Sequence, residues 1–165
     1  MRRLYLLRHG VAAPPEPPDL LDDDRRLTAE GEKKVRQIAK GLRRLDLKLD
    51  RIVTSPLPRA RRTAEIVADR LRLSDHCEQL DVLRAGNSAS AIREWLDTQQ
   101  DERLMVVGHN PALSDLIGLL IAGSSGAVSL GLRKGGVAAL SPNPTGGGYS
   151  LDWLARPRLI RRLIL

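Results

Sequence analysis

The sequence predicts an α/β fold, a three-layer α/β/α sandwich with a mainly parallel central sheet. Short apolar runs, which are typical of buried strands, alternate along the chain with segments whose apolar residues recur at helical spacing. Such alternation indicates βα units, whose helices cover both faces of the sheet. The length of 165 residues corresponds to about one domain, so we expect a single domain over residues 1–165.

Six strands are expected from the apolar runs, at residues 4–7, 51–54, 79–83, 104–107, 137–140 and 149–154. Residues 11–24 include four prolines and four aspartates, which predicts a surface loop after the first strand. Residues 156–165 are expected to pack against the domain as a terminal segment.

Four helices are expected between the strands. Thr28 is a suitable cap for the first helix, and the second begins near Arg59. Ser88 or Asn87 is expected to cap the third. Asn110 is expected as the N-cap of the fourth, with Pro111 at its first position.

The charge of the chain favours an anionic partner. It carries 27 basic and 20 acidic residues, a net charge of +7, and 22 of the basic residues are Arg. The planar guanidinium binds two oxygens of a phosphate at once. The basic residues are spread along the whole chain, however, and most are expected to form an ordinary solvated surface. Aromatic residues make up only 2%, which argues against nucleic acid as a partner.

Cysteine content and hydropathy indicate the cellular compartment in which we expect the protein. Cys77 is the only cysteine, which excludes an internal disulfide and a cysteine-based metal site. No run reaches the ~18 apolar residues of a membrane span. We therefore expect a cytoplasmic, monomeric protein that contacts no membrane.

Two of the three histidines directly follow a predicted core strand. His9 ends the first strand within Arg8-His9-Gly10, and His109 follows the fourth within Gly108-His109-Asn110. A third polar cluster, from Ser55 to Arg59, follows the second strand. Ligands bind outside the carboxyl ends of the strands in such sheets, so we expect these groups to meet there. His76, in a polar loop, is interpreted as a surface residue.

Three motifs carry a resemblance to a known family. They are Leu7-Arg8-His9-Gly10, the segment from Thr54 to Glu65 (Thr-Ser-Pro-Leu-Pro-Arg-Ala-Arg-Arg-Thr-Ala-Glu), and Val106-Val107-Gly108-His109-Asn110-Pro111. In order and spacing they resemble the signatures of the histidine phosphatase (phosphoglycerate mutase-like) superfamily. The short chain is similar to its small SixA-type phosphohistidine phosphatases. The resemblance implies a phosphoglycerate mutase-like sandwich.

The resemblance also implies roles for individual residues. His9 matches the nucleophile, which takes the phosphoryl group onto its imidazole. Arg8, Arg59 and His109 match the residues that surround the phosphate, and they complete the expected catalytic set. A phosphate or sulfate anion is expected in the site, and neither a metal nor another cofactor is implied. Arg62 stands where many relatives have glutamine, so its role stays open.

The substrate follows from what the motifs lack. Relatives that cleave phosphomonoesters use an acidic residue to protonate the leaving oxygen, and Glu78 and Asp81 are the nearest candidates for a proton donor. A phosphoramidate leaves as a neutral imidazole once its nitrogen is protonated, so it needs less help. The short chain leaves little length for a lid, which favours an open site. The resemblance thus implies a phosphohistidine phosphatase that acts on proteins.

Two alternatives stay open at this point. One is a broad phosphatase of the same family that acts on small phosphomonoesters or polyphosphates. The other is a basic module that binds anions or nucleic acid without catalysis. The net charge favours the second alternative, whereas the scarcity of aromatic residues and the lack of a basic run oppose it.

Overall fold

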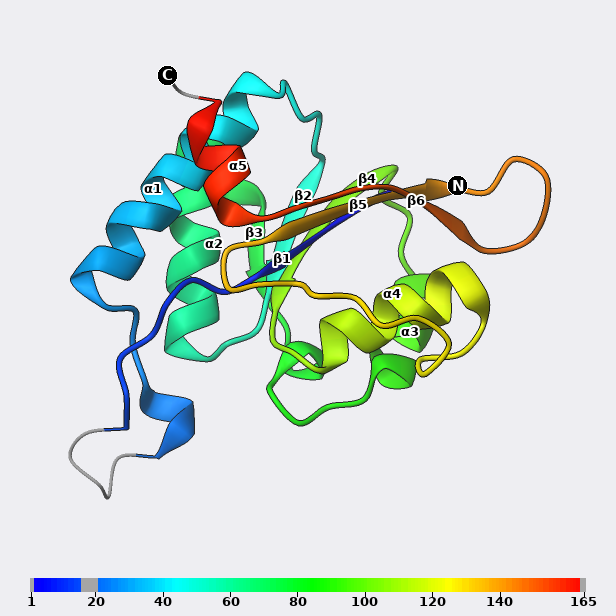
Figure 1. Cartoon of the computed structure of the whole chain (residues 1–165), viewed down its shortest axis with the longest axis horizontal. Helices are drawn as coiled ribbons and strands as arrows, with labels where there is room; N and C mark the ends of the chain where they lie inside the picture. Colours follow the sequence, from blue (N-terminus) through cyan, green and yellow to red (C-terminus); the bar gives the residue numbers. More distant parts are fainter. Residues whose placement is uncertain (1, 16–20, 164–165) are drawn as a thin grey trace.

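The computed structural model describes residues 2–15 and 21–163, and these residues form a three-layer α/β/α sandwich (Figure 1). The central sheet has the strand order β3-β2-β4-β1-β5-β6. The strands are β1 (Arg3–Arg8), β2 (Arg51–Thr54), β3 (Cys77–Gln79), β4 (Arg103–Gly108), β5 (Val137–Pro142) and β6 (Tyr149–Ala155). Strands β3, β2, β4 and β1 are mutually parallel, and β5 is antiparallel to both of its neighbours. The predicted fold class is confirmed.

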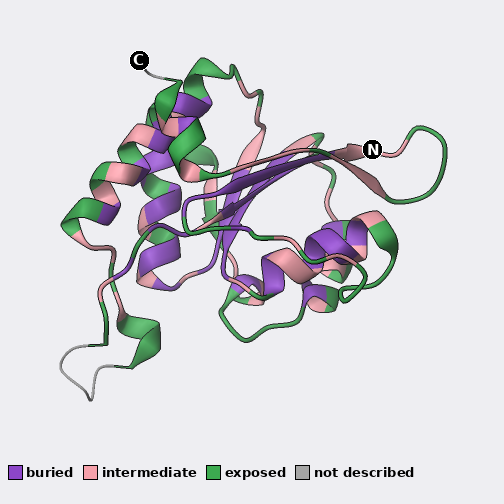
Figure 2. Cartoon of the chain, viewed as in Figure 1, coloured by how far each residue is buried: buried purple, intermediate pink, exposed green. Residues whose placement is uncertain are grey.

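Helices cover both faces of this sheet. They are α1 (Ala29–Arg44), α2 (Pro58–Leu71), α3 (Ala89–Asp97), α4 (Ala112–Ala122) and α5 (Pro157–Arg162). Successive strand residues point to opposite faces, so β1 sends Leu4 and Leu6 toward α3 and α4, and Tyr5 and Leu7 toward α1, α2 and α5. Figure 2 shows the buried strands between the two helical layers.

The predicted caps of α1 and α3 are confirmed. The Thr28 hydroxyl accepts a hydrogen bond from the Gly31 amide at 2.8 Å, and the Ser88 hydroxyl accepts one from the Ala91 amide at 3.2 Å. Each bond satisfies one of the amides that a helix leaves unpaired at its start.

Two predicted elements are wrong in position. The third strand occupies Cys77–Gln79, whereas residues 81–83 form a 3-10 turn, η3, that buries Leu83 against the core of the α3 and α4 face. Asn110 does not cap α4, because its side-chain amide donates instead to the Leu132 carbonyl at 3.1 Å. Pro111 occupies the cap position, and the helix begins at Ala112.

The described residues of the predicted loop at 11–24 follow the carboxyl end of β1. Ala12 forms an isolated antiparallel bridge with Leu27, and a 3-10 turn, η1, covers Asp22–Asp24. Residues 16–20 of this loop lie outside the described residues.

The predicted docking of the terminal segment is confirmed as far as residue 163. Ile160 of α5 is buried against α1, where a Cβ atom on Gly41 would lie 2.2 Å from the Ile160 carbonyl oxygen. Gly41 therefore permits the close approach of the two helices. Residues 164 and 165 of the predicted segment lie outside the described residues.

None of the described helices is long and apolar enough to cross a membrane.

Candidate active site

Three neighbouring parallel strands each end in a polar residue at the same edge of the sheet. Ser55 follows β2, His109 follows β4 and His9 follows β1. The ladder continues past the strands, because the His9 amide donates to the Gly108 carbonyl at 3.1 Å and the Ser55 amide to the Val107 carbonyl at 3.0 Å. The sheet thus places all three side chains together and below the surface.

The two histidines lie side by side. Their ring centroids are 5.1 Å apart, the rings are tilted by 55°, and each residue is only 4% exposed. Buried polar groups normally have hydrogen-bond partners, so the partners of each ring decide what it can do.

One nitrogen of His9 is held by the backbone. Nδ1 lies 2.7 Å from the Gly10 carbonyl oxygen, and since a carbonyl only accepts, Nδ1 carries the hydrogen. In the neutral ring, Nε2 then holds the lone pair. Gly10 comes close to α1, where a Cβ atom would lie 2.6 Å from a methyl carbon of Val35. The loop that orients His9 therefore requires glycine here.

Thr63 links the His9 loop to α2. The Gly10 amide donates to the Thr63 hydroxyl at 3.0 Å, and this hydroxyl donates to the Arg59 carbonyl at 2.7 Å. Thr63 is fully buried, and it lies one helical turn after Arg59. These two hydrogen bonds fix the position of the His9 loop relative to the backbone at Arg59.

His109 is held by Ser55. The Nε2 atom lies 2.8 Å from the Ser55 hydroxyl, which also accepts a hydrogen bond from the Leu57 amide at 3.2 Å. The other nitrogen, Nδ1, is buried and has no partner among the described residues.

The Arg59 side chain, 3% exposed, is bound by η1. One nitrogen of its guanidinium donates to the Asp22 carbonyl at 2.7 Å, and another lies 3.0 Å from the Asp22 carboxylate. The same carboxylate pairs with Arg25 at 2.9 Å. Burial lowers the pKa of Arg59, and the Asp22 charge opposes that shift.

Arg8, at the end of β1, is half-buried. It donates to the Leu132 carbonyl at 3.1 Å, the same oxygen that accepts from Asn110. Burial lowers the pKa of Arg8, and Arg133 lowers it further. The two side chains hold the segment before β5 against the site.

Both imidazoles are neutral near pH 7. The pKa of His9 is lowered to about 3, mainly by burial and then by the charges of His109, Arg59 and Arg8, while the Gly10 hydrogen bond opposes the shift. Burial also lowers the pKa of His109 to about 4, with Arg59 as the next cause. Desolvation and nearby cations both disfavour a second proton on each ring.

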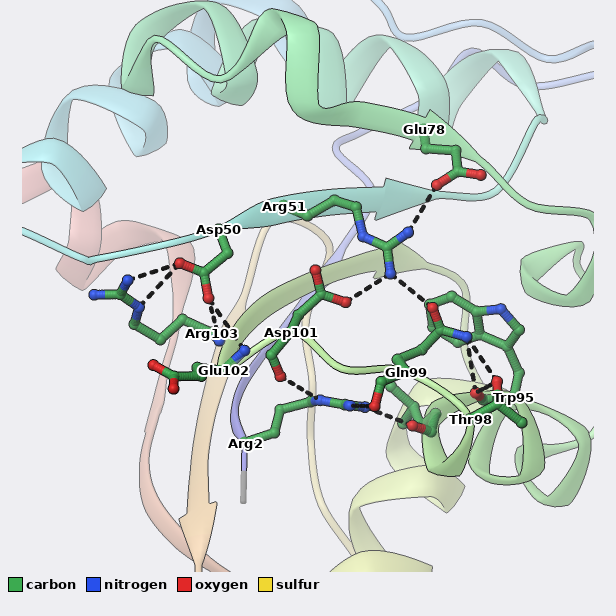
Figure 3. Close-up of polar contacts among 11 residues, drawn as sticks. Arg2, Asp50, Arg51, Glu78, Trp95, Thr98, Gln99, Asp101, Glu102 and Arg103 are labelled. Atoms are coloured by element: carbon green, nitrogen blue, oxygen red, sulfur yellow. Dashed lines mark hydrogen bonds and ion pairs between the residues drawn. The ribbon is translucent and has the colours of Figure 1, made fainter.

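Three residues considered from the sequence lie elsewhere. Glu78 binds Arg51 at 2.9 Å, at the start of β2 and thus at the opposite edge of the sheet from His9 (Figure 3). The Asp81 carboxylate, 88% exposed, pairs with Arg84 at 3.2 Å. Neither carboxylate contacts the two imidazoles. His76 is exposed in a turn before β3.

Arg62, whose role the sequence left open, forms ion pairs on the helical face. Its guanidinium binds Glu32 at 2.9 Å and Glu65 at 3.4 Å. The hydrogen bond that Arg62 donates to the Glu32 carboxylate is the main reason that the pKa of Arg62 is raised.

Sequence reasoning assigned no role to three residues of the site. Ser55 was expected at this end of the sheet as part of the polar cluster after the second strand, but its bond to His109 was not predicted. Thr63 had a weak signal in the sequence, because it lies four residues after Arg59 on one helix face. Asp22 had no signal in the sequence, because its contact with Arg59 depends on the path of the loop between β1 and α1.

Comparison with known proteins identifies the family. A model of the histidine phosphatase superfamily (branch 1) matches residues 4–85. An uncharacterized protein of Picosynechococcus sp. is 38% identical over 141 residues, which cover 83% of each chain. The chain belongs to the histidine phosphatase superfamily. This histidine phosphatase is accordingly an enzyme, and the alternative of a non-catalytic binding module is set aside.

Other relatives of this histidine phosphatase share nearly its whole length. Phosphohistidine phosphatase SixA of Escherichia coli is 25% identical over 158 residues, 94% of each chain. A solved structure of the protein histidine phosphatase SixA complexed with tungstate has a TM-score of 0.83 at 24% identity, covering 96% of this chain and 99% of that one. Phosphoglycerate mutase of Bacillus anthracis has a TM-score of 0.76 at 16% identity, covering 99% and 97%. The predicted phosphoglycerate mutase-like fold is confirmed.

Proposed function

We propose that this histidine phosphatase hydrolyses phosphorylated histidine side chains of proteins, with His9 as the nucleophile. The observation that carries the proposal is the pair of buried, neutral imidazoles 5.1 Å apart with Arg8 and Arg59 beside them. The relative SixA of Escherichia coli bears the name of this activity. A neutral imidazole is a nucleophile, and cations around it suit an incoming phosphoryl group.

In the first step, the Nε2 lone pair of His9 attacks phosphorus. A bond forms between Nε2 and phosphorus while the bond from phosphorus to the substrate nitrogen breaks. The bonding electrons stay on that nitrogen, which takes a proton from solvent and leaves as neutral imidazole. The Gly10 carbonyl holds the Nδ1 hydrogen throughout and stabilises the positive charge that develops on the ring.

The cations would stabilise the charge on the transferring group. A phosphoryl group in transfer spreads negative charge over three equatorial oxygens. Arg8 Nε, Arg59 Nε and His109 Nδ1 are buried nitrogens with no partner among the described residues. An unpaired buried polar group costs about 1–3 kcal/mol, so a phosphoryl oxygen that accepts from these nitrogens would bind favourably.

In the second step, water attacks phosphorus, the bond to Nε2 breaks, and inorganic phosphate leaves. His9 recovers its lone pair, and the cycle closes with no change of oxidation state. We further propose that the enzyme acts as a single-domain monomer in the cytoplasm.

The positions of the carboxylates favour phosphohistidine over an alkyl phosphate. An alkoxide needs a proton donor as it leaves, whereas the nitrogen of a phosphohistidine takes its proton from solvent and leaves easily as neutral imidazole. Glu78 is bound at the opposite edge of the sheet, and Asp81 is exposed and paired with Arg84. An arginine therefore pairs with each of these carboxylates, which supports a substrate whose leaving group needs no carboxylic acid as proton donor.

The test compares His9→Ala with His76→Ala, which removes an exposed histidine instead. A phosphohistidine peptide, p-nitrophenyl phosphate and tripolyphosphate are assayed side by side. We expect the peptide to be the best substrate, His9→Ala to lose at least 1,000-fold in kcat/KM, and His76→Ala to keep full activity. Acid-labile radioactive phosphate should be trapped on the wild type and absent from His9→Ala. Turnover by His9→Ala would falsify the nucleophile, and preference for tripolyphosphate or p-nitrophenyl phosphate would overturn the substrate.

A further inference from the structure

A basic groove lies at the amino ends of the parallel strands, on the side of the sheet opposite the two histidines. Three adjoining cavities form it, and the largest has a volume of about 540 Å³. They adjoin because the first shares Arg43 and Arg70 with one neighbour and Lys48 and Arg103 with the other. The groove runs between the ends of α1 and α2 and the start of β4.

Most of the excess charge of the chain gathers here. Eight cationic side chains and one carboxylate line the three cavities, whereas the whole chain has a net charge of +7. Two of the cations are neutralised locally, since Lys48 pairs with Asp46 at 2.7 Å and Arg103 with Asp50 at 2.7 Å (Figure 3 shows the second pair).

Arg43, Arg70 and Arg72 are among the groove cations that have no such partner. Among the residues that the structure describes, no carboxylate lies within 4.0 Å of Arg43, Arg70 or Arg72. Arg43 and Arg70 lie in the last turns of α1 and α2, where the helix dipole favours cations. Arg72 is the C-cap residue of α2, so its charge lies at the same negative end of the helix dipole.

The backbone at the groove carries side chains where glycine is favoured. Asp46 (φ 51°) and Arg72 (φ 61°) are the two non-glycine residues with positive φ in the described chain, and both line the largest cavity. Arg72 caps α2 in the left-handed conformation, at a position where helices usually place glycine. An arginine kept in this conformation is consistent with a use for its side chain.

We propose that this basic groove binds a small ligand that carries two or more phosphoryl groups. A cavity of about 540 Å³ falls within the usual range for small-molecule sites. Its cations exceed what one phosphate can use, because each guanidinium can bind two oxygens. Half-buried Leu47, Leu49, Leu71 and Leu73 form its floor and pack on the core, which fixes the chain segments that carry the arginines. The proposal is independent of the function proposed above.

The test is calorimetric titration of the His9→Ala protein, which cannot turn over the ligand, with tripolyphosphate, ATP and inorganic phosphate. The groove variant adds R70S/R72G, and a matched control adds R156S/R158S, which removes two exposed arginines that do not line the groove. We expect tripolyphosphate and ATP to bind the groove variant at least tenfold more weakly, and the control within twofold of the parent. Inorganic phosphate should bind the groove at least tenfold more weakly than tripolyphosphate.

R72G distinguishes the loss of the binding site from the loss of the fold. R72G alone should raise the melting temperature, because glycine adopts the left-handed cap without strain, while it weakens binding at least threefold. Tighter binding of ATP than of tripolyphosphate would show that the nucleoside contributes, and equal binding that the phosphoryl groups suffice. Equal affinity of the groove variant and the control would overturn the proposal. So would groove-dependent binding of a 20-nucleotide RNA that tripolyphosphate does not displace.

Discussion

Asp22→Asn should tighten the binding of oxyanions at the candidate active site. The Asp22 carboxylate lies 3.0 Å from the buried guanidinium of Arg59, the group that we propose binds the phosphate. A phosphoryl oxygen that binds the same guanidinium must compete with this carboxylate. Asparagine is nearly the same size and removes the charge, while the Asp22 backbone carbonyl still accepts from Arg59 at 2.7 Å.

The expected gain in the free energy of anion binding lies between two known limits. An exposed ion pair is worth about 0.2–1 kcal/mol, and a hydrogen bond to a charged buried group about 1.5–3 kcal/mol. The Arg59 side chain is buried, but the Asp22 side chain is 64% exposed and its carboxylate also pairs with Arg25, so water and Arg25 screen the interaction. We therefore expect about 1 kcal/mol, which is about fivefold in the dissociation constant.

The assay is calorimetric titration with tungstate or phosphate at pH 7.5. Asp23→Asn is the matched control, because it removes the same charge one residue away and its carboxylate contacts Arg84 at 3.7 Å instead of Arg59. A fivefold gain for Asp22→Asn against less than twofold for Asp23→Asn supports the competition. Equal gains would show a general electrostatic effect, and weaker binding by Asp22→Asn would refute the reasoning.

Three further predictions concern the residues that hold the His9 loop and the protonation of the two histidines. Gly10→Ala should lower the free energy of unfolding by about 1–3 kcal/mol through its clash with Val35, and Val35→Ala in the same chain should restore part of it in urea titrations. Thr63→Val should lower kcat about tenfold with little change in KM, since it acts on the His9 loop, and Thr63→Ser should restore the rate. The pKa values of His9 and His109, about 3 and about 4, lie below those of the unfolded chain, so stability is complete above about pH 6.5 and falls as the pH falls. Urea titrations at pH 8 and pH 4.5 should differ by about 3–5 kcal/mol, and a constant stability would contradict the lowered pKa values.

The strands and the edge that carries the site could be predicted from local pattern. Apolar runs define β1, β2 and β4 because these strands are buried on both faces. A residue that follows such a strand is held at the carboxyl edge by the sheet itself. This is why sequence position alone brought His9 and His109 together.

The errors came from contacts between distant segments. Asn110 has the residue type and position of an N-cap, yet its amide binds Leu132, which is 22 residues away. Glu78 is near the predicted site along the chain, but it belongs to the three-residue strand β3. The neighbouring strand β2 begins with Arg51, which binds the Glu78 carboxylate. A pairing of this kind depends on strand order, and strand order is not a local property of the sequence.

Burial and charge at this site support each other in the proposed reaction. His9 needs a lone pair at neutral pH, and the phosphate needs cations within reach of the same nitrogen. Arg8 and Arg59 meet both needs, because a cation beside a buried imidazole lowers its pKa and also attracts the anion that the imidazole will attack. An anion bound beside His109 would raise the pKa of this imidazole from about 4, because negative charge favours the protonated ring. In the proposed reaction, a phosphoryl group in the site and a proton on His109 would therefore favour each other.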